Sequence, residues 1–107
     1  MLTRDAIIEK VASFSQEIVA NGVLLDKVIL FGSYAKGTPN EHSDIDVALV
    51  ADCFSGFGFE DRKFFSKINI KKPYIEIETK TYPTQYFYNS DPFIEEILKY
   101  GIVIYEK

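Results

Sequence analysis

The stretch that decides the fold is "ILFGSYAKGTPNEHSDIDVALV", residues 29–50. Apolar runs at its two ends enclose a glycine–serine pair, a lysine, a second glycine and two aspartates one residue apart. A charged side chain loses its hydration when it is buried, so aspartate within an apolar strand is costly unless something compensates for it. Two aspartates here, shortly after a glycine-containing turn, raise the question of what offsets their charge.

The two aspartates share one side of their strand. Successive side chains of a strand point to opposite faces, so Asp44 and Asp46 lie on the same face with Cα atoms about 6.5 Å apart. Two carboxylates this close repel each other unless a cation or a proton lies between them. Oxygen ligands of this kind suit Mg²⁺, which binds through one or two carboxylates and substrate phosphates. A pair of such ions stabilises both oxygens of a phosphoryl displacement.

The glycine–serine turn offers a place for a phosphate. Gly32 and Ser33 follow the apolar strand and begin a short helix, so free backbone N–H groups point outwards there. Gly32 permits close approach of the backbone, the Ser33 hydroxyl is a donor, and Lys36 brings a positive charge to a polyphosphate. Ser43, just before the first aspartate, is either a further contact of this kind or a turn residue that supports the loop.

A third carboxylate is expected on another strand. The segment "YIEIETKT", residues 74–81, alternates strictly between apolar and polar side chains and predicts a strand. Glu76 and Glu78 share one of its faces, and an adjacent strand would bring one of them beside Asp44 and Asp46. A carboxylate there is suited to accept a proton from an attacking hydroxyl. Alternating glutamate and isoleucine is also typical of a half-exposed edge strand, so at most one of the two is expected to be catalytic.

Two helices are predicted from apolar spacing and capping residues. The first covers residues 3–20 with Thr3 as its N-cap, and its apolar residues recur every three or four positions, as one buried face requires: Ile7, Val11, Phe14 and Ile18. The second follows Asp91, an N-cap with proline at the first helical position, and Gly101 ends it. Its predicted apolar face consists of Phe93, Ile94, Ile97 and Leu98.

The remaining elements complete a small mixed architecture. Strands are predicted at residues 24–31, 44–50, 74–81 and 102–105, with a short helix at 34–36. Residues 52–70, with two glycines among aromatic side chains, predict a flexible excursion that contains a short helix near 60–67. The order α, β, short α, β, β, α, β indicates a single domain over residues 1–107, of the α+β class (α/β-like), with a small mixed β-sheet flanked by helices.

Composition narrows the classes of function. The 107 residues carry a net charge of −4, which argues against non-specific binding of nucleic acid. Cys53 and His42 are the single residues of their types, so neither a disulfide framework nor a multi-histidine metal site is expected. The N-terminus lacks a signal pattern, and no apolar run approaches the roughly 18 residues of a membrane span. A cytoplasmic protein without a membrane anchor is therefore expected.

Each feature of the opening stretch has an ordinary structural explanation when taken alone. Most glycine–serine pairs are only turns, Asp-x-Asp is common on a solvated strand, and Lys36 by itself is typical of a surface lysine. The combination is far more specific: G-S-x-x-x-G, five residues, then S-D-I-D-V, all behind an apolar strand.

These residues resemble the minimal nucleotidyltransferases, small members of the polymerase-β-like nucleotidyltransferase superfamily. The segments "FGSYAKG" and "SDIDVALV" match the family's strand, glycine–serine turn, short helix and Asp-x-Asp strand, with Lys36 where arginine is more usual. The segment "IETKTY" resembles the I-E-x-x-x-Tyr/Phe stretch of some members. On this likeness Glu78 fits the third carboxylate best, and Glu76 remains the alternative.

The resemblance implies a nucleotidyltransferase fold and a set of roles. Gly32 and Ser33 would bind the triphosphate, and Asp44 and Asp46 would hold two Mg²⁺ ions, with the third carboxylate as a further ligand or as the base. The reaction implied is Mg²⁺-dependent transfer of a nucleoside monophosphate, commonly AMP from ATP, to an acceptor hydroxyl.

The resemblance also implies a partner. Minimal members often pair with a small helical HEPN-domain protein, for which they act as antitoxin, and a hydroxyl of that protein would be the acceptor. The alternative is a catalytically weak nucleotide-binding module that neutralises a partner by complex formation. A third option is RNA or a small molecule as acceptor, and the acidic balance argues against RNA. Homo-oligomers and hetero-oligomers both stay open.

Overall fold

Four strands form one mixed β-sheet in the computed structural model, which describes residues 3–39, 44–88 and 91–107. β1 (Leu25–Phe31) is antiparallel to both of its neighbours, β2 (Ile45–Ala51) and β4 (Ile102–Glu106). β3 (Ile77–Pro83) runs parallel to β2, so the order across the sheet is β3-β2-β1-β4. The mixed sheet with its helices confirms the predicted α+β class.

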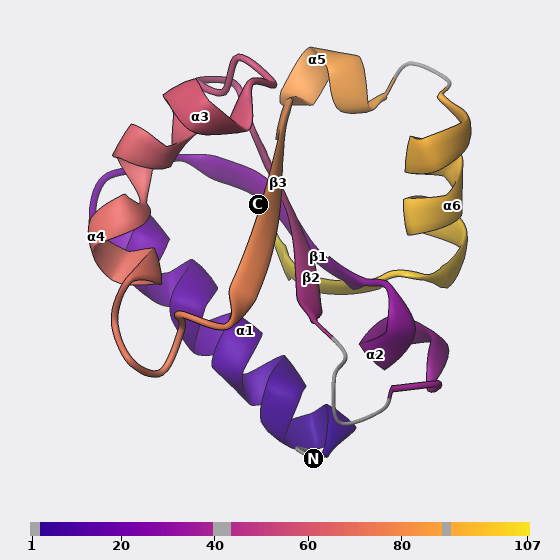
Figure 1. Ribbon diagram of the computed structural model, residues 1–107. Coiled ribbons are helices and arrows are strands. Elements are labelled where there is room, and N and C mark those ends of the chain that lie inside the picture. The colour runs from indigo at the N-terminus through magenta and orange to yellow at the C-terminus, as the bar shows by residue number, and fades with distance from the viewer. Residues whose placement is uncertain (1–2, 40–43, 89–90) are drawn as a thin grey trace.

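Helices cover both faces of the sheet (Figure 1). They are α1 (Arg4–Ala20), α2 (Ser33–Lys36), α3 (Gly58–Asp61), the 3₁₀ turn η1 (Arg62–Phe64), α4 (Ser66–Asn69), α5 (Thr84–Phe87) and α6 (Pro92–Tyr100). Alternate side chains of β1 and β2 serve two separate cores. The larger core lies under α1 and includes Val28, Leu30, Val47 and Leu49. The smaller core lies under α5 and α6 and includes Ile29, Ala48 and Val50.

The first helix forms as its spacing predicts. The hydroxyl of Thr3 accepts a hydrogen bond from the backbone N–H of Ala6 at 3.1 Å, which caps the N-terminus of α1. All four residues of the predicted apolar face are fully buried. Burying each such side chain stabilises the fold by roughly 1.5–3 kcal/mol, so this face fixes α1 on the sheet.

The third strand begins later than predicted. Its predicted start, residues 74–76, lies in a turn, and β3 begins at Ile77 and continues to Pro83. Tyr74 is buried against Phe14, with 5.4 Å between ring centroids. The side-chain amide of Asn69 donates to the carbonyl of Tyr74 at 2.9 Å, so this carbonyl has a partner outside any strand ladder. Alternation alone could not predict these long-range contacts.

The prediction of a flexible excursion at residues 52–70 is wrong, although the short helix expected near 60–67 is present as a series of short helical turns. The segment contains α3, η1 and α4, and Phe65 and Ile68 are buried in the larger core. Asp61 is only 1% exposed and its carboxylate accepts from the backbone N–H groups of Ser55 and Gly56, at 2.8 and 3.0 Å. The hydroxyl of Thr81 on β3 donates to it at 2.6 Å. A buried carboxylate therefore orders a loop whose glycines and aromatic residues suggested mobility.

The last helix buries a narrower face than predicted. Ile94 and Ile97 are buried, whereas Phe93 is 44% and Leu98 is 49% exposed. Phe93 instead packs edge-to-face on Phe31, with 6.0 Å between ring centroids. β3 ends at Pro83, two residues later than predicted, whereas the predicted boundaries of α1, β1, α2, β2, α6 and β4 agree with the structure to within one residue. Among the described residues, no helix has the length and apolarity needed to cross a membrane.

Candidate active site

The glycine–serine turn and the second aspartate meet at the end of β1. The β1–β2 register pairs Phe31 with Asp46, which brings the next residue, Gly32, against the aspartate side chain. Gly32 has φ +76° and ψ −155°, a conformation that essentially only glycine adopts. A Cβ placed on Gly32 would lie 2.3 Å from Oδ2 of Asp46. Glycine is therefore required both for the backbone conformation and for the position of this carboxylate.

A four-residue helix follows the turn and is tied to the N-terminal helix. α2 begins at Ser33 and is closed by Gly37 in the left-handed conformation. The guanidinium of Arg4 on α1 donates to the carbonyl of Ala35 at 3.1 Å, and Tyr34 is buried, which fixes α2 against the larger core. The hydrogen bond from Arg4 and the burial of Tyr34 therefore fix α2, and with it the direction of the backbone N–H groups at its start.

The carboxylates gather on one face of the sheet. The parallel β2–β3 register pairs Asp46 with Glu78, and paired residues of neighbouring strands share a face. Asp46 is half-buried, whereas Asp44 and Glu78 are exposed. Burial raises the pKa of Asp46 above its ordinary value, and the negative charges of Asp44 and Glu78 raise it further. The three carboxylates therefore lie near enough to affect each other's charge, as the sequence predicts.

The two glutamates of the alternating segment have different surroundings. Glu78 lies on β3 opposite Asp46. Glu76 precedes the strand, is exposed, and forms an ion pair with Lys10 of α1 at 3.7 Å. The structure therefore brings Glu78, and not Glu76, to the aspartates.

Two lysines lie around the site, Lys36 in the pocket that Gly32 lines and Lys80 near Asp46, and the sequence predicted only Lys36. Lys36 points to α6, where its Nζ lies 2.9 Å from Oε1 of Glu96. The hydrogen bond that Lys36 donates to the Glu96 carboxylate raises the pKa of Lys36. Lys80, two residues after Glu78, lies near enough to Asp46 for its charge to oppose the rise in the aspartate's pKa. Strand alternation places Lys80 on the face of Glu78, and that signal could have found it. The predicted phosphate contact of Ser43 lies outside the described residues.

The oxygen ligands suit a hard divalent cation that is completed by a substrate. Within residues 3–39, 44–88 and 91–107, no three acidic, histidine or cysteine side chains form a ready-made metal cage. Mg²⁺ usually keeps several waters and binds through one or two carboxylates plus phosphates, so such a cage is not required. The close approach of the Asp46 carboxylate to the backbone of Gly32, and the like charges around Asp46, fit Mg²⁺ held jointly with a phosphate.

The fold and this site define a class of enzyme, one that transfers a nucleotidyl group. The chain belongs to the polymerase beta nucleotidyltransferase family, because the family profile described as "Polymerase beta, Nucleotidyltransferase" matches residues 9–107. A relative named "Putative protein adenylyltransferase MJ0141", from Methanocaldococcus jannaschii, is 32% identical over 106 residues. That alignment covers 92% of this chain and 98% of the relative.

Solved structures share the fold at low sequence identity. A crystal structure from Sulfolobus solfataricus, titled as that of a "putative nucleotidyltransferase", matches with a TM-score of 0.67 and 16% identity. The match covers 97% of this chain and 84% of that one. A chain from the crystal structure of a toxin–antitoxin with AMP-PNP matches with a TM-score of 0.61 and 16% identity, over 90% of this chain and 73% of that one.

Proposed function

We propose that this chain is an Mg²⁺-dependent adenylyltransferase that moves AMP from ATP to a hydroxyl of a partner protein. The observation that carries the proposal is the close approach of Gly32 to Asp46, with Glu78 opposite that aspartate in the sheet. The 32% identical relative that is named a protein adenylyltransferase supports both the adenylyl group and the protein acceptor.

Each part of the site has a role in this reaction. The N–H groups and the hydroxyl at Gly32 and Ser33 bind the triphosphate, and Asp44 and Asp46 hold Mg²⁺. When bound, Mg²⁺ neutralises charge on the phosphates and on the attacking and leaving oxygens. The acceptor oxygen forms a bond to the α-phosphorus while the bond to the β-phosphate oxygen breaks, and pyrophosphate leaves with that electron pair. Glu78 takes the proton of the acceptor hydroxyl.

The acceptor in this proposal is a small helical HEPN-type toxin that the chain neutralises as its antitoxin. The fold neighbour from a toxin–antitoxin structure supports a partner of this kind. Phe57 and Phe59, which are 70% and 93% exposed, offer apolar surface away from the carboxylates. Exposed aromatic side chains of this size are typical of protein interfaces.

A second candidate is a nucleotide-binding module that neutralises its partner by complex formation without transfer. One observation is compatible with it. Lys36, the predicted phosphate contact, is already paired with Glu96 at 2.9 Å. A lysine held in this ion pair fits a site that binds nucleotide and turns over slowly.

One labelling experiment separates the two candidates. The protein is incubated with Mg²⁺, ATP labelled in the α-phosphate, and the protein encoded beside its gene. The wild type and the control Asp52→Asn, which alters an exposed aspartate outside the site, should label the partner equally. The double variant Asp44→Asn, Asp46→Asn should not. If the wild type forms the complex without transferring label, the enzymatic proposal fails and the binding module stands.

A further inference from the structure

A groove lies along the free edge of β3, between this strand and the helical turns η1 and α4. The sheet order places β3 at one edge, and in the part of the chain that the structure describes it pairs only with β2. The groove has a volume of about 230 Å³, and its walls include Arg62, Ser66, Asn69, Glu78 and Thr79. Figure 1 shows α4 beside β3, on the side away from α6.

Backbone groups of β3 point into this groove. The N–H of Ile77 donates to the carbonyl of Tyr74 at 3.0 Å, and the carbonyl of Ile77 accepts from the side-chain amide of Asn69 at 3.4 Å. Neither partner belongs to β2, so both groups point away from the sheet. Residues two apart in a strand direct their backbone groups to the same side, so the N–H and C=O of Thr79 also face the groove. A strand edge of this kind is a template for pairing with another extended chain.

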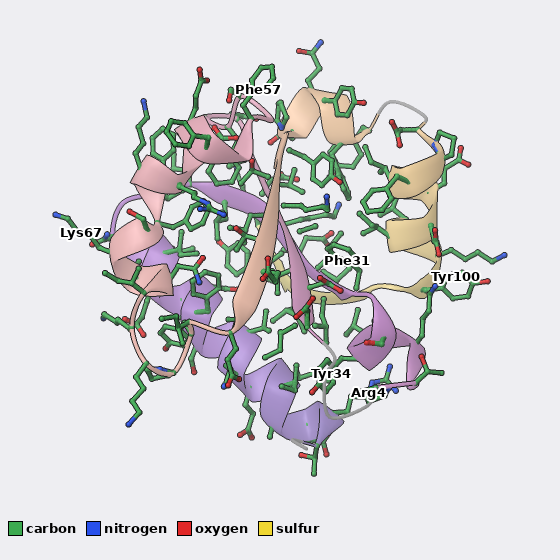
Figure 2. The ribbon with its side chains drawn as sticks, viewed as in Figure 1. Arg4, Phe31, Tyr34, Phe57, Lys67 and Tyr100 are labelled. Carbon is green, nitrogen blue, oxygen red and sulfur yellow. The ribbon has the colours of Figure 1, made fainter. Side chains whose placement is uncertain are left out.

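Positive charge surrounds the groove, although the chain as a whole carries a net charge of −4. Residues 62–72 contain five of the 12 lysine and arginine residues and no aspartate or glutamate. All five are exposed, and Figure 2 shows Lys67 extending from α4 into the solvent. We call them the basic strip: Arg62, Lys63, Lys67, Lys71 and Lys72. A basic strip on an acidic protein complements a negatively charged ligand.

The apolar residues of the groove favour a polypeptide over a nucleic acid. Ile70 and Ile75, which line it, are 69% and 63% exposed. Bases stack on aromatic rings, which isoleucine lacks, whereas apolar side chains of an extended peptide pack on isoleucine. The free N–H and C=O groups of a strand edge match the alternating acceptors and donors of a peptide backbone. The groove therefore suits an extended, acidic segment of protein.

The groove also reaches the proposed base. Glu78 forms part of its wall and pairs with Asp46 in the register of β2 and β3. Paired residues of neighbouring strands share a face of the sheet, so a residue added opposite Glu78 would lie on the face of the carboxylates. Neighbouring strands lie about 4.8 Å apart, so a serine, threonine or tyrosine at that position brings its hydroxyl close to Glu78.

We propose that this groove binds an extended, acidic segment of the partner protein, which adds to the free edge of β3 as a further strand and presents its hydroxyl to Glu78. The inference rests on the proposed function, because the segment belongs to the partner that the site modifies. It adds the chemical class of the acceptor segment, and the surface of β3, η1 and α4 that recognises it.

Fluorescence polarisation with short labelled peptides tests strand addition through binding alone. The probe is a peptide that alternates glutamate with valine, and in its charge-reversed form lysine replaces glutamate. The glutamate peptide should bind the whole chain at least about tenfold more tightly, because the basic strip attracts it and repels the other. Two further peptides are N-methylated at every valine or at every glutamate. Only one of these sets of N–H groups faces β3 in an added strand, so one peptide should lose binding and the other should keep it.

Substitutions in the chain test the two parts of the groove. Thr79→Pro removes an N–H that faces the groove, a change that an edge strand tolerates, and should weaken binding of the glutamate peptide about tenfold. Arg62→Glu should weaken it by about the same factor, because a charge-assisted contact is lost. Lys99→Glu makes the same change of charge at an exposed lysine of α6, outside the groove, and should keep the wild-type affinity. Urea midpoints check that each variant is folded, and the N-methylated peptides test the backbone contact if Thr79→Pro is not.

The outcomes separate this inference from the proposed function. If the two N-methylated peptides bind equally, or if Arg62→Glu and Lys99→Glu weaken binding equally, the inference is wrong. It is also wrong if a single-stranded RNA binds more tightly than the glutamate peptide and Arg62→Glu weakens that binding, because the strip is then a nucleic-acid site. Peptide binding as expected, with no label transferred from ATP to the partner, overturns the proposed transfer and leaves the docking surface standing. Labelling of the partner without peptide binding overturns the docking surface alone.

Discussion

Replacing Gly32 by alanine tests whether this residue positions Asp46 for chemistry. The added Cβ would lie 2.3 Å from Oδ2 of Asp46, and ordinary contact begins near 3.4 Å, so the carboxylate must move by about 1 Å. A 1 Å misplacement in a catalytic site costs about 100-fold in rate, which corresponds to roughly 2.7 kcal/mol in the activation barrier. The unfavourable backbone conformation adds about 1–3 kcal/mol of destabilisation to the folded state.

Gly37→Ala controls for placing alanine at a positive φ, although the ψ of Gly37, 21°, differs from the −155° of Gly32. Gly37 has nearly the same φ, +77°, but its added Cβ would meet no atom within 4 Å. Alanine there should cost about 1–2 kcal/mol of stability and leave transfer unchanged. Urea unfolding measures stability, and release of labelled pyrophosphate from ATP in the presence of the partner measures the rate. If folded Gly32→Ala retains activity within threefold of Gly37→Ala, the proposed contact does not position the carboxylate.

Three further predictions follow from the surroundings of single side chains. Glu78→Gln should lower the transfer rate at least 100-fold because a proton acceptor is lost, whereas Glu76→Gln should leave it within twofold. Asp61→Asn should lower the free energy of unfolding at pH 7 by about 2 kcal/mol, because buried donors lose a charged acceptor. Lys36→Met should raise the KM for ATP about tenfold with little change in stability, because its ion pair with Glu96 is exposed.

The prediction for Asp61 also has a pH dependence with a definite sign. Burial alone would raise the pKa of Asp61, but hydrogen bonds from Ser55, Thr81 and Gly56 favour the charged form and lower it below 3.8. A lowered folded-state pKa contributes stability above the unfolded-state value, and this contribution is lost as the pH falls through the folded-state value. We therefore expect the urea midpoints of the wild type and Asp61→Asn to become more similar below about pH 4. A constant difference from pH 7 to pH 3 would contradict the assigned hydrogen bonds.

The remaining predictions have simple controls. Equal and mild effects of the two glutamine variants would mean that neither Glu78 nor Glu76 takes part in the reaction. Lys67→Met, at an exposed lysine on α4, controls for the loss of one positive charge. If it raises the KM as much as Lys36→Met, the effect is general electrostatics and not a phosphate contact.

Local sequence patterns predicted the elements whose structure depends on nearby residues. The four apolar residues of α1 and the Thr3 cap act within one helix, and the structure confirms both. The Asp91–Pro92 start of α6 is also confirmed, with the Asp91 carboxylate accepting from the N–H of Phe93 at 2.8 Å. Patterns of this kind are reliable because the groups that interact lie within one or two turns of each other.

Predictions failed where distant residues compete with local preference. Alternation at residues 74–76 is typical of a strand, but Asn69 and the buried ring of Tyr74 hold them in a turn. Residues 52–70 have no clear periodicity, and their order comes from Asp61, whose partners include Thr81 on β3. No local spacing contains the information that a hydroxyl twenty residues away will satisfy a buried carboxylate.

The sequence by itself determined the chemical groups of the site and their local spacing. A glycine–serine turn after an apolar strand, and two aspartates on one strand face, depend only on chain geometry over a few residues. The tertiary structure decided which glutamate joins them, because the β2–β3 register pairs Asp46 with Glu78 while Glu76 turns to Lys10. The long segment between β2 and β3 contains no tight turn that would fix this register, so local spacing could not predict which glutamate pairs with Asp46.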